Sequence, residues 1–368
     1  MTTAVDVNLL WLISGRVGGS EEYTVGLLDA LADVVDASVR VRLFTQPGLS
    51  RVHPSLAEAY DIVELPRRVS AKPMRFGLES SWLAVQTRHA DLVHHGGGVL
   101  PYGGRGRSVV TVHDLQPLDL PENFTPAQRH WFRRMLPRVA RSADRVICPS
   151  MFTRERIVAL LGVDRSCIDI VSPVHLPRPA RVASSTASPF GRYVLLPAMA
   201  HPHKRHVDAI EALDHLRGRH PELNLVFTGA PGTASDAIEN SRRRLALQAR
   251  VHVLGRVDAS ELEDLMHGAA AMVFPSLYEG FGNPVLEAMA VGTPVIAADA
   301  TALPEVAGGA ALLVPPADPL ALSEAIDRLL TEPELVEELR RNGRRRVEDF
   351  NPEVAGRQLL DAYRDALS

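Results

Sequence analysis

The segment S-L-Y-E-G-F-G-N-P-V-L-E-A-M-A, residues 276–290, constrains the fold most, because it joins a strand, a glycine loop and a helix. An apolar run of buried-strand length, residues 269–274, leads into it. Gly280 and Gly282 then allow tight turns and a close approach of the backbone to a ligand. Pro284 suits the first position of the helix that follows. Unpaired N–H groups at that helix N-terminus, beside a glycine loop, predict a site for an anion.

Two carboxylates lie on either side of Asn283, the predicted N-cap of this helix. Glu279 lies in the loop, and Glu287 follows eight residues later among apolar neighbours. A carboxylate in apolar surroundings needs hydrogen-bond donors. Attraction to the helix dipole accounts for Glu287, but it leaves Glu279 and the G-F-G-N-P turn unexplained.

The pattern E-G-F-G-x-P-x-x-E-A-M-A resembles the signature of the retaining glycosyltransferases of the GT-B fold, family 4 (group 1). The resemblance implies an α/β protein of two Rossmann-like domains whose parallel sheets face each other across a cleft. It implies that Glu279 faces the donor sugar and that Glu287 holds the ribose hydroxyls of a nucleotide. The loop at Phe281, Gly282 and Asn283 would turn its backbone amides toward the sugar and the diphosphate.

Chain length and composition limit the possible number of domains and the possible classes of function. A chain of 368 residues is long for one core and suits two domains. The net charge of −4 gives no sign of a nucleic-acid partner. Two cysteines fit a reducing compartment. No apolar run approaches the ~20 residues of a membrane span, and no basic segment precedes the first apolar stretch, so we expect a cytoplasmic protein.

The first half alternates strand-like and helical stretches, which predicts a parallel sheet with helices on both faces. The predicted strands cover residues 5–13, 39–44, 62–65, 92–94, 109–113 and 145–148. A glycine loop, residues 14–20, follows the first strand and leads into a predicted helix over residues 21–31. The resemblance places Gly18 and Gly19 near the diphosphate and the acceptor, and a plain tight turn is the alternative.

The motif V-H-D-L ends one predicted strand with His113 and Asp114. Ligands of parallel sheets bind at the carboxyl ends of the strands. Successive side chains of a strand point to opposite faces, so spacing alone does not make this pair a dyad. A structural histidine that is hydrogen-bonded at a strand end is the alternative. The resemblance implies that His113 contacts the donor sugar and that Asp114 orients a group or serves the acceptor side.

A Pro-, Ser- and Ala-rich stretch, residues 176–191, predicts a linker between two domains. Strand-like runs then resume at residues 193–196, 223–228 and 251–254. We therefore predict an acceptor-side domain over residues 1–180 and a nucleotide-sugar domain over residues 190–350. A final helix over residues 351–368 would pack back on the first domain, as the resemblance implies.

A cationic cluster, H-P-H-K-R-H at residues 201–206, precedes a predicted helix of the second half. A lysine or arginine there would neutralise a diphosphate through charge-assisted hydrogen bonds. Lys204 matches the family's lysine. Many members carry an arginine several residues earlier, which residues 197–200 lack, and this leaves His203 or Arg205 as the second cation.

Two other stretches carry predictions. Gly255, Arg256 and Val257 resemble the family's loop whose backbone contacts the nucleobase. Residues 128–141 form a basic stretch with interleaved aromatic side chains, which Pro137 interrupts. This stretch suits either an ordinary surface helix or a helix that lies on an anionic membrane.

The resemblance implies transfer of a hexose from a nucleotide diphosphate sugar, with retention, to a glycan, lipid-linked or small-molecule acceptor. GDP-mannose is the first expected donor and UDP-glucose the second. Lys204 and the helix N-terminus would stabilise the leaving diphosphate, and without an acidic metal motif we expect no metal and no cofactor. Glu279 would position the sugar and would not be the nucleophile. A non-catalytic sugar-nucleotide-binding protein and a GT-B-like nucleotide-sugar epimerase are the alternatives.

Overall fold

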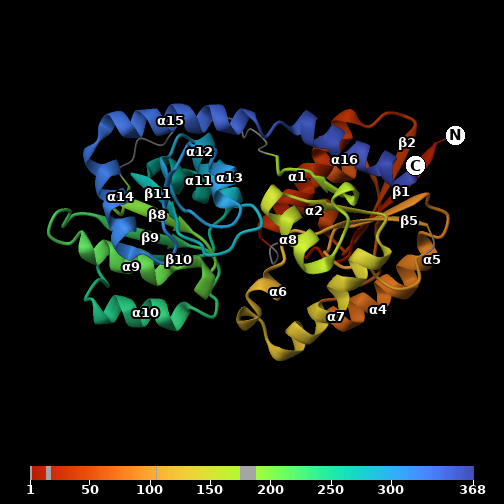
Figure 1. Cartoon of the computed structure of the whole chain (residues 1–368), viewed down its shortest axis with the longest axis horizontal. Helices are drawn as coiled ribbons and strands as arrows, with labels where there is room; N and C mark the ends of the chain where they lie inside the picture. Colours follow the sequence, from red (N-terminus) through yellow and green to blue (C-terminus); the bar gives the residue numbers. More distant parts are fainter. Residues whose placement is uncertain (1, 14–17, 105, 175–187) are drawn as a thin grey trace. The chain divides into compact units, whose positions relative to one another are not determined.

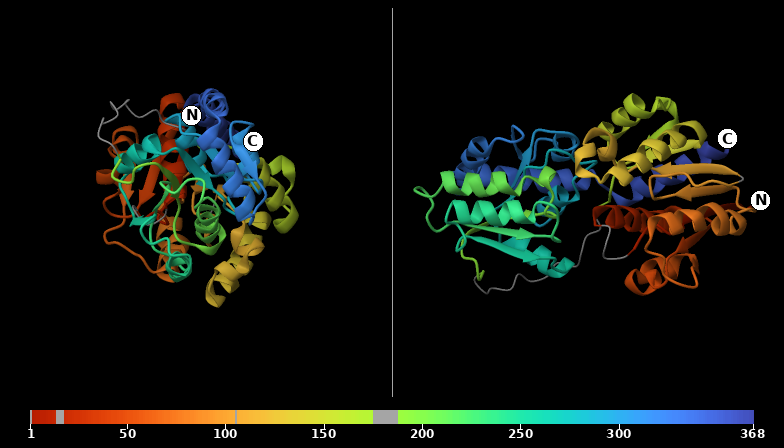
Figure 2. Two further views of the ribbon diagram at one scale, coloured as in Figure 1. Left: turned by 90° about the vertical axis from the view of Figure 1, so that its left-hand side faces the viewer. Right: turned by 90° about the horizontal axis from the view of Figure 1, so that it is seen from below.

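The computed structural model describes residues 2–13, 18–104, 106–174 and 188–368. The chain divides into two compact units, the first formed by residues 1–176 and 350–368 and the second by residues 177–349. Each unit contains a parallel sheet with helices on its faces, as Figures 1 and 2 show. Among the described residues, no helix is both long and apolar enough to cross a membrane.

The first unit is built on a seven-stranded sheet of order β3-β2-β1-β4-β5-β6-β7. Its strands are β1 Thr3–Leu9, β2 Val39–Thr45, β3 Asp61–Glu64, β4 Leu92–His95, β5 Arg107–Thr111, β6 Arg145–Cys148 and β7 Ile168–Ile170. All pairings are parallel. A parallel sheet is covered on both faces, which explains the nearly continuous apolar runs from which its strands were predicted.

Helices and short turns connect these strands. They are α1 Gly19–Val34, α2 Leu49–Val52, α3 Pro54–Ala59, α4 Lys72–Leu78, the π-helix η1 Glu79–Leu83, α5 Ala84–Gln86, α6 Gln116–Asp119, η2 Pro121–Asn123, α7 Pro126–Ser142, α8 Met151–Leu161 and η3 Arg165–Cys167. The last helix, α16 Pro352–Leu367, also belongs to this unit and lies beside α1 (Figure 1).

Two contacts fix α16 in the first unit. Gly356 faces α1 so closely that a Cβ there would collide with the carbonyl oxygen of Ala30. Tyr363 is fully buried, and its hydroxyl lies 2.8 Å from His94 Nδ1, while His94 Nε2 lies 2.7 Å from Thr111 Oγ1. The C-terminal helix therefore supplies part of the core of the first unit.

The second unit has a six-stranded parallel sheet of order β10-β9-β8-β11-β12-β13. Its strands are β8 Tyr193–Pro197, β9 Asn224–Thr228, β10 Val251–Gly255, β11 Ala271–Phe274, β12 Val295–Ala298 and β13 Leu312–Val314. Its helices are η4 Pro202–Lys204, α9 His206–His215, α10 Ser235–Arg244, α11 Ala259–Gly268, α12 Asn283–Ala290, α13 Leu303–Ala307, α14 Pro319–Thr331 and α15 Pro333–Glu348.

Several local predictions need correction. The first strand ends at Leu9, not at residue 13, and β5 ends at Thr111, before His113. Pro137 does not interrupt the basic stretch, because α7 runs through it from Pro126 to Ser142. Although Pro137 donates no backbone N–H, a capping box formed by Thr125 and Gln128 and the buried side chains around the proline hold the helix together.

Candidate active site

The loops that leave β8, β9 and β11 meet at one edge of the second sheet, because parallel strands all end at the same edge. Glycines let two of these loops approach backbone to backbone. A Cβ on Gly229 or Gly232 would collide with the carbonyl oxygens of Ala198 and Ala200, respectively. Sequence analysis did not assign these glycines a role, although the motif G-A-P-G marks them. They hold the loop that precedes Lys204 against its neighbour.

Lys204 and Glu279, which are 75 residues apart, form the central contact of this edge. Lys204 Nζ lies 2.5 Å from Glu279 Oε1 and 5.3 Å from the centre of the Phe274 ring. Both charged side chains are largely buried, and Leu277 N–H donates to the carbonyl of His203 at 2.8 Å, which ties the two loops together. The structure thus brings two of the predicted site residues into direct contact.

The two side chains predicted to act as a second cation are poorly placed for that role. Arg205 has left-handed backbone geometry, with φ of 58°, and its Nε donates to Asp208 at 2.7 Å. Burial, together with the nearby charge of Lys204, lowers the pKa of His203 to about 3, so this imidazole is neutral at pH 7. Lys204 is therefore the cation of this loop that the geometry favours for an anion.

The N-cap of α12 lies one residue earlier than predicted. Gly282 has φ of 114° and is itself the N-cap of α12, so Asn283 is the first helical residue and not the cap. Glycine is suited to this position because a Cβ would lie 2.7 Å from Leu303 Cδ2, in addition to the strained φ. Glu279 N–H donates to Thr301 Oγ1 at 3.1 Å, which fixes the other end of the loop.

The remaining predicted residues of the second unit lie in the glycine loop, in α12 and at the end of β10. Phe281 is buried in the glycine loop, and Glu287 is partly buried in α12, with Leu286 and Ala288 buried on either side. Gly255 ends β10 in left-handed geometry and accepts a hydrogen bond of 2.8 Å from Gly229 N–H.

Arg256 and Val257 follow Gly255 directly as a loop. Because β10 is parallel to β9, this loop leaves the sheet at the same edge as the others.

His113 lies two residues beyond β5, at the carboxyl edge of the first sheet. Its Nε2 donates to Gly96 O at 2.9 Å, and the rings of Trp11 and Tyr23 lie 5.4 and 5.3 Å away. Burial lowers the pKa of His113 to about 4, so the ring is neutral at pH 7. With its proton on Nε2, Nδ1 remains as a hydrogen-bond acceptor, which suits a hydroxyl group and not an anion.

The other predicted residues of the first unit have local structural partners. Asp114 is exposed, and its Oδ1 accepts a hydrogen bond of 2.9 Å from Gln116 N–H at the start of α6. Gly18, with φ of 72°, is the N-cap of α1, and Gly19 is the first residue of that helix. The rest of the predicted glycine loop, residues 14–17, lies outside the described residues.

Comparisons with known proteins identify the family of the chain. Residues 186–346 match the family model described as "Glycosyl transferases group 1", and residues 17–174 match "Glycosyltransferase Family 4". The chain is 30% identical over 358 residues to the MMP alpha-(1->4)-mannosyltransferase of Mycolicibacterium hassiacum, covering 89% of this chain and 84% of the relative. It is 28% identical over 326 residues to the O-antigen chain mannosyltransferase B of Escherichia coli, covering 85% and 81%, respectively.

Solved structures support the same fold. Anabaena Alr3699/HepE in complex with UDP and glucose superposes with a TM-score of 0.76 at 17% identity, over 99% of this chain and 100% of that one. WaaG, a glycosyltransferase involved in lipopolysaccharide biosynthesis, gives a TM-score of 0.72 at 15% identity, over 97% and 98%. The chain therefore belongs to the group 1 glycosyltransferases of family 4 and is a mannosyltransferase-like glycosyltransferase of the GT-B fold.

Proposed function

We propose that this glycosyltransferase moves a hexose from a nucleotide diphosphate sugar to a hydroxyl group with retention of anomeric configuration. GDP-mannose is the first proposed donor, which the mannosyltransferases among the relatives support, and UDP-glucose is the second. The acceptor is a glycan, a lipid-linked sugar or a small molecule. The observation that carries the proposal is the Lys204–Glu279 pair beside the N-terminus of α12.

Each group at this edge has a distinct proposed role. Lys204 and the first N–H groups of α12 stabilise the charge that develops on the leaving diphosphate. Glu279 accepts hydrogen bonds from the hydroxyls of the transferred sugar and so positions it. Because Glu279 also pairs with Lys204, a diphosphate would compete with this carboxylate for the lysine.

The nucleoside has its own contacts in the proposal. Glu287 holds the ribose hydroxyls, and the backbone of the loop at Gly255, Arg256 and Val257 contacts the base. The amides of Phe281, Gly282 and Asn283 face the sugar and the diphosphate. If only backbone atoms contact the base, the shape of the loop decides between GDP and UDP, and the side chains do not reveal it. The donor must therefore be identified by experiment.

Retention follows, in this proposal, from attack of the acceptor hydroxyl on the face that the diphosphate leaves. The departing phosphate oxygen takes the proton of the attacking hydroxyl, so no side chain forms a covalent intermediate. His113, neutral and with Nδ1 as acceptor, serves a sugar hydroxyl. Metal independence and a cytoplasmic location belong to the same proposal.

Contact with an anionic membrane is a further part of this proposal. Helix α7 carries five arginines and no carboxylate. Helix α4 adds cations beside it, since Lys72 lies over the Phe132 ring and Phe76 packs edge-on against Trp131. Binding to vesicles that contain phosphatidylglycerol, with no binding to phosphatidylcholine vesicles, would support this contact.

Product analysis tests the reaction itself. The purified protein is incubated with GDP-mannose, UDP-glucose and an acceptor panel, and the products are analysed by mass spectrometry and NMR. A new α-glycosidic bond with release of the nucleoside diphosphate supports retaining transfer. A changed sugar that is still attached to its nucleotide would show an epimerase. Donor binding without turnover of any acceptor would favour a non-catalytic binding protein.

A further inference from the structure

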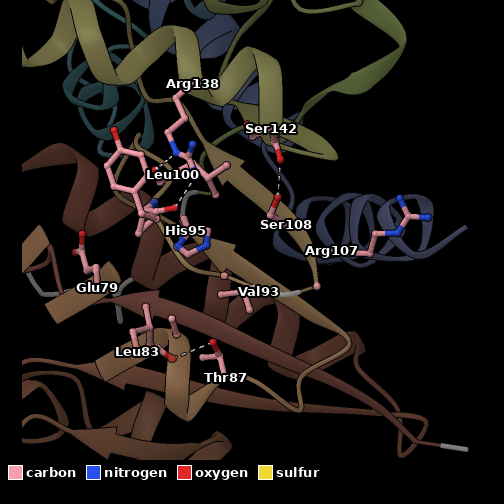
Figure 3. Close-up of a pocket in the computed structure, with 15 residues that line it drawn as sticks. Glu79, Leu83, Thr87, Val93, His95, Leu100, Arg107, Ser108, Arg138 and Ser142 are labelled. Carbon is pink, nitrogen blue, oxygen red and sulfur yellow. Dashed lines mark hydrogen bonds between the residues drawn. The ribbon is translucent and has the colours of Figure 1, made fainter. Parts of the chain in front are cut away.

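A cavity of about 130 Å³ lies within the first unit, on one face of β4 and β5 (Figure 3). Helices η1 and α5 form one wall, α7 forms another, and the β4–β5 connection covers it with Leu100 and Tyr102. Adjacent histidines of β4 point to opposite faces of the sheet. His94 binds Tyr363 of α16, whereas His95 lines the cavity. None of the roles proposed above uses this cavity.

Hydrogen bonds fix the tautomer of His95. Leu10 N–H donates to Asn8 Oδ1 at 3.1 Å, which turns the NH₂ group of Asn8 toward His95. Asn8 Nδ2 then lies 3.2 Å from His95 Nδ1 and donates to it. His95 must therefore carry its proton on Nε2. The residue is only 7% exposed, and in the described part of the chain Nε2 has no hydrogen-bond partner. The cavity thus contains an N–H donor without an acceptor.

Glu79 supplies the complementary group. It is the first residue of the π-helix η1, it lines the same cavity, and it is 4% exposed. Burial raises the pKa of Glu79 to about 7, while the charge of Arg75, at 3.5 Å, and a hydrogen bond from Asn8 act in the opposite direction. A carboxyl group offers more acceptor sites than these two contacts use. One asparagine therefore holds a donor and an acceptor at the same cavity.

The cationic side chains around the cavity already have partners. Arg138 donates to the carbonyls of Leu100 and Pro101 at 3.1 and 3.3 Å and stacks over the Tyr102 ring at 4.3 Å. Arg107 donates to Asp144 at 2.8 Å. An anion would meet Glu79 without an uncommitted cation to balance it. The apolar parts of the wall, which include Leu83 and Val93 (Figure 3), suit C–H groups.

We propose that this cavity binds a small neutral polyol, one hydroxyl of which accepts from His95 Nε2 and donates to Glu79. The volume of about 130 Å³ suits a compact ligand such as glycerol or the hydroxymethyl end of a monosaccharide. Paired donor and acceptor contacts distinguish a hydroxyl from a methyl group, because a ligand without the hydroxyl gives the His95 N–H no acceptor. This site is independent of the donor chosen above.

The test uses glycerol, free mannose and inorganic phosphate as probes with the full chain. Binding is followed by saturation-transfer NMR and by calorimetry. Ala84→Phe fills the cavity from α5, and His95→Phe keeps the ring but removes the donor. Val85→Phe is the matched control, because the neighbouring Val85 is 55% exposed and does not line the cavity. Melting temperatures establish that each variant is folded.

The proposal expects the wild type and Val85→Phe to bind glycerol or mannose with similar affinity. It expects both cavity variants to lose about tenfold or more in affinity, and it expects no binding of phosphate. Polyol binding that is unchanged in folded Ala84→Phe would place the ligand elsewhere. The absence of polyol binding in the wild type, or preferred binding of phosphate, would overturn the assignment.

Discussion

The two units differ in the charge of the side chains that face their candidate sites. The second unit presents an ion pair, Lys204 with Glu279, at the carboxyl edge of its sheet. The first unit presents His95 and His113, whose pKa values burial lowers to about 4. A fixed cation suits a diphosphate, whereas neutral imidazoles suit hydroxyl groups. The comparison therefore separates recognition of the charged leaving group from recognition of sugars or polyols.

Loss of the positive charge of Lys204 should have the largest effect on the function of the second unit. We expect Lys204→Ala to lower turnover about 10²–10³-fold, because the developing charge on the diphosphate loses a preorganised partner. Lys72→Ala is the matched control, since Lys72 is the other lysine of the chain and lies in α4 of the first unit. Release of nucleoside diphosphate measures turnover. Equal rates in the two variants would show that the second unit does not depend on this charge.

Substitution of Glu279 and Glu287 should separate sugar recognition from nucleotide recognition within the second unit. Glu287→Ala should weaken binding of free nucleoside diphosphate about 10- to 100-fold, since it removes charge-assisted hydrogen bonds to ribose. Glu279→Ala should leave that affinity nearly unchanged and lower turnover, because the free nucleotide carries no sugar. Calorimetry and steady-state rates measure the two effects. Equal losses of nucleotide affinity in both variants would contradict the assigned roles.

The neutral histidines of the first unit should appear in the pH dependence of stability. Burial lowers the pKa of His94 to about 3, whereas an unfolded histidine titrates near pH 6.5. The unfolded chain therefore binds protons first, so stability is complete above about pH 6.5 and is lost as the pH falls toward 3. Urea unfolding of His94→Gln should show a slope against pH that is smaller by up to about 1.4 kcal/mol per unit.

The exposed His89 provides a control for this measurement. His89→Gln should keep the wild-type pH slope. If His94→Gln also kept it, the imidazole of His94 would not be held neutral in the folded protein, and the contrast between the units would weaken.

The smallest expected effect concerns metals. Excess EDTA should leave turnover unchanged, because Lys204 and the N-terminus of α12 supply positive charge to the diphosphate in the proposed mechanism. Rates before and after chelation, then with added Mg²⁺ or Mn²⁺, measure this directly. A loss that only the metal restores would replace the proposed cation with a metal ion.

Local sequence predicted much of the architecture. The segment from Glu279 to Glu287 predicted the family and the fold class, and both predictions are confirmed. The strand, loop and helix of this segment follow one another directly in sequence, so the spacing of its residues is enough to predict their local arrangement. Apolar runs likewise indicated ten strands, but β7, β12 and β13 were missed. Strand β7 has only three residues, and such a short run gives little periodic signal.

Long-range contacts could not be predicted in the same way. Asn8 and His95 are 87 residues apart, and no pattern near His95 shows that an asparagine will select its tautomer. The hydrogen bond from Arg205 to Asp208 also depends on side-chain geometry, although the two residues are close in sequence. The different contacts of the adjacent histidines His94 and His95 follow from the opposite faces of β4.

The docking of α16 has a consequence for biosynthesis. The second unit is one continuous segment, whereas the first unit needs residues from before and after that segment. Tyr363 and the glycine contact between Gly356 and Ala30 become available only after the whole second unit has been synthesised. We therefore expect the second unit to complete its folding first during translation. The sheet of the first unit would keep an apolar face uncovered until α16 is available.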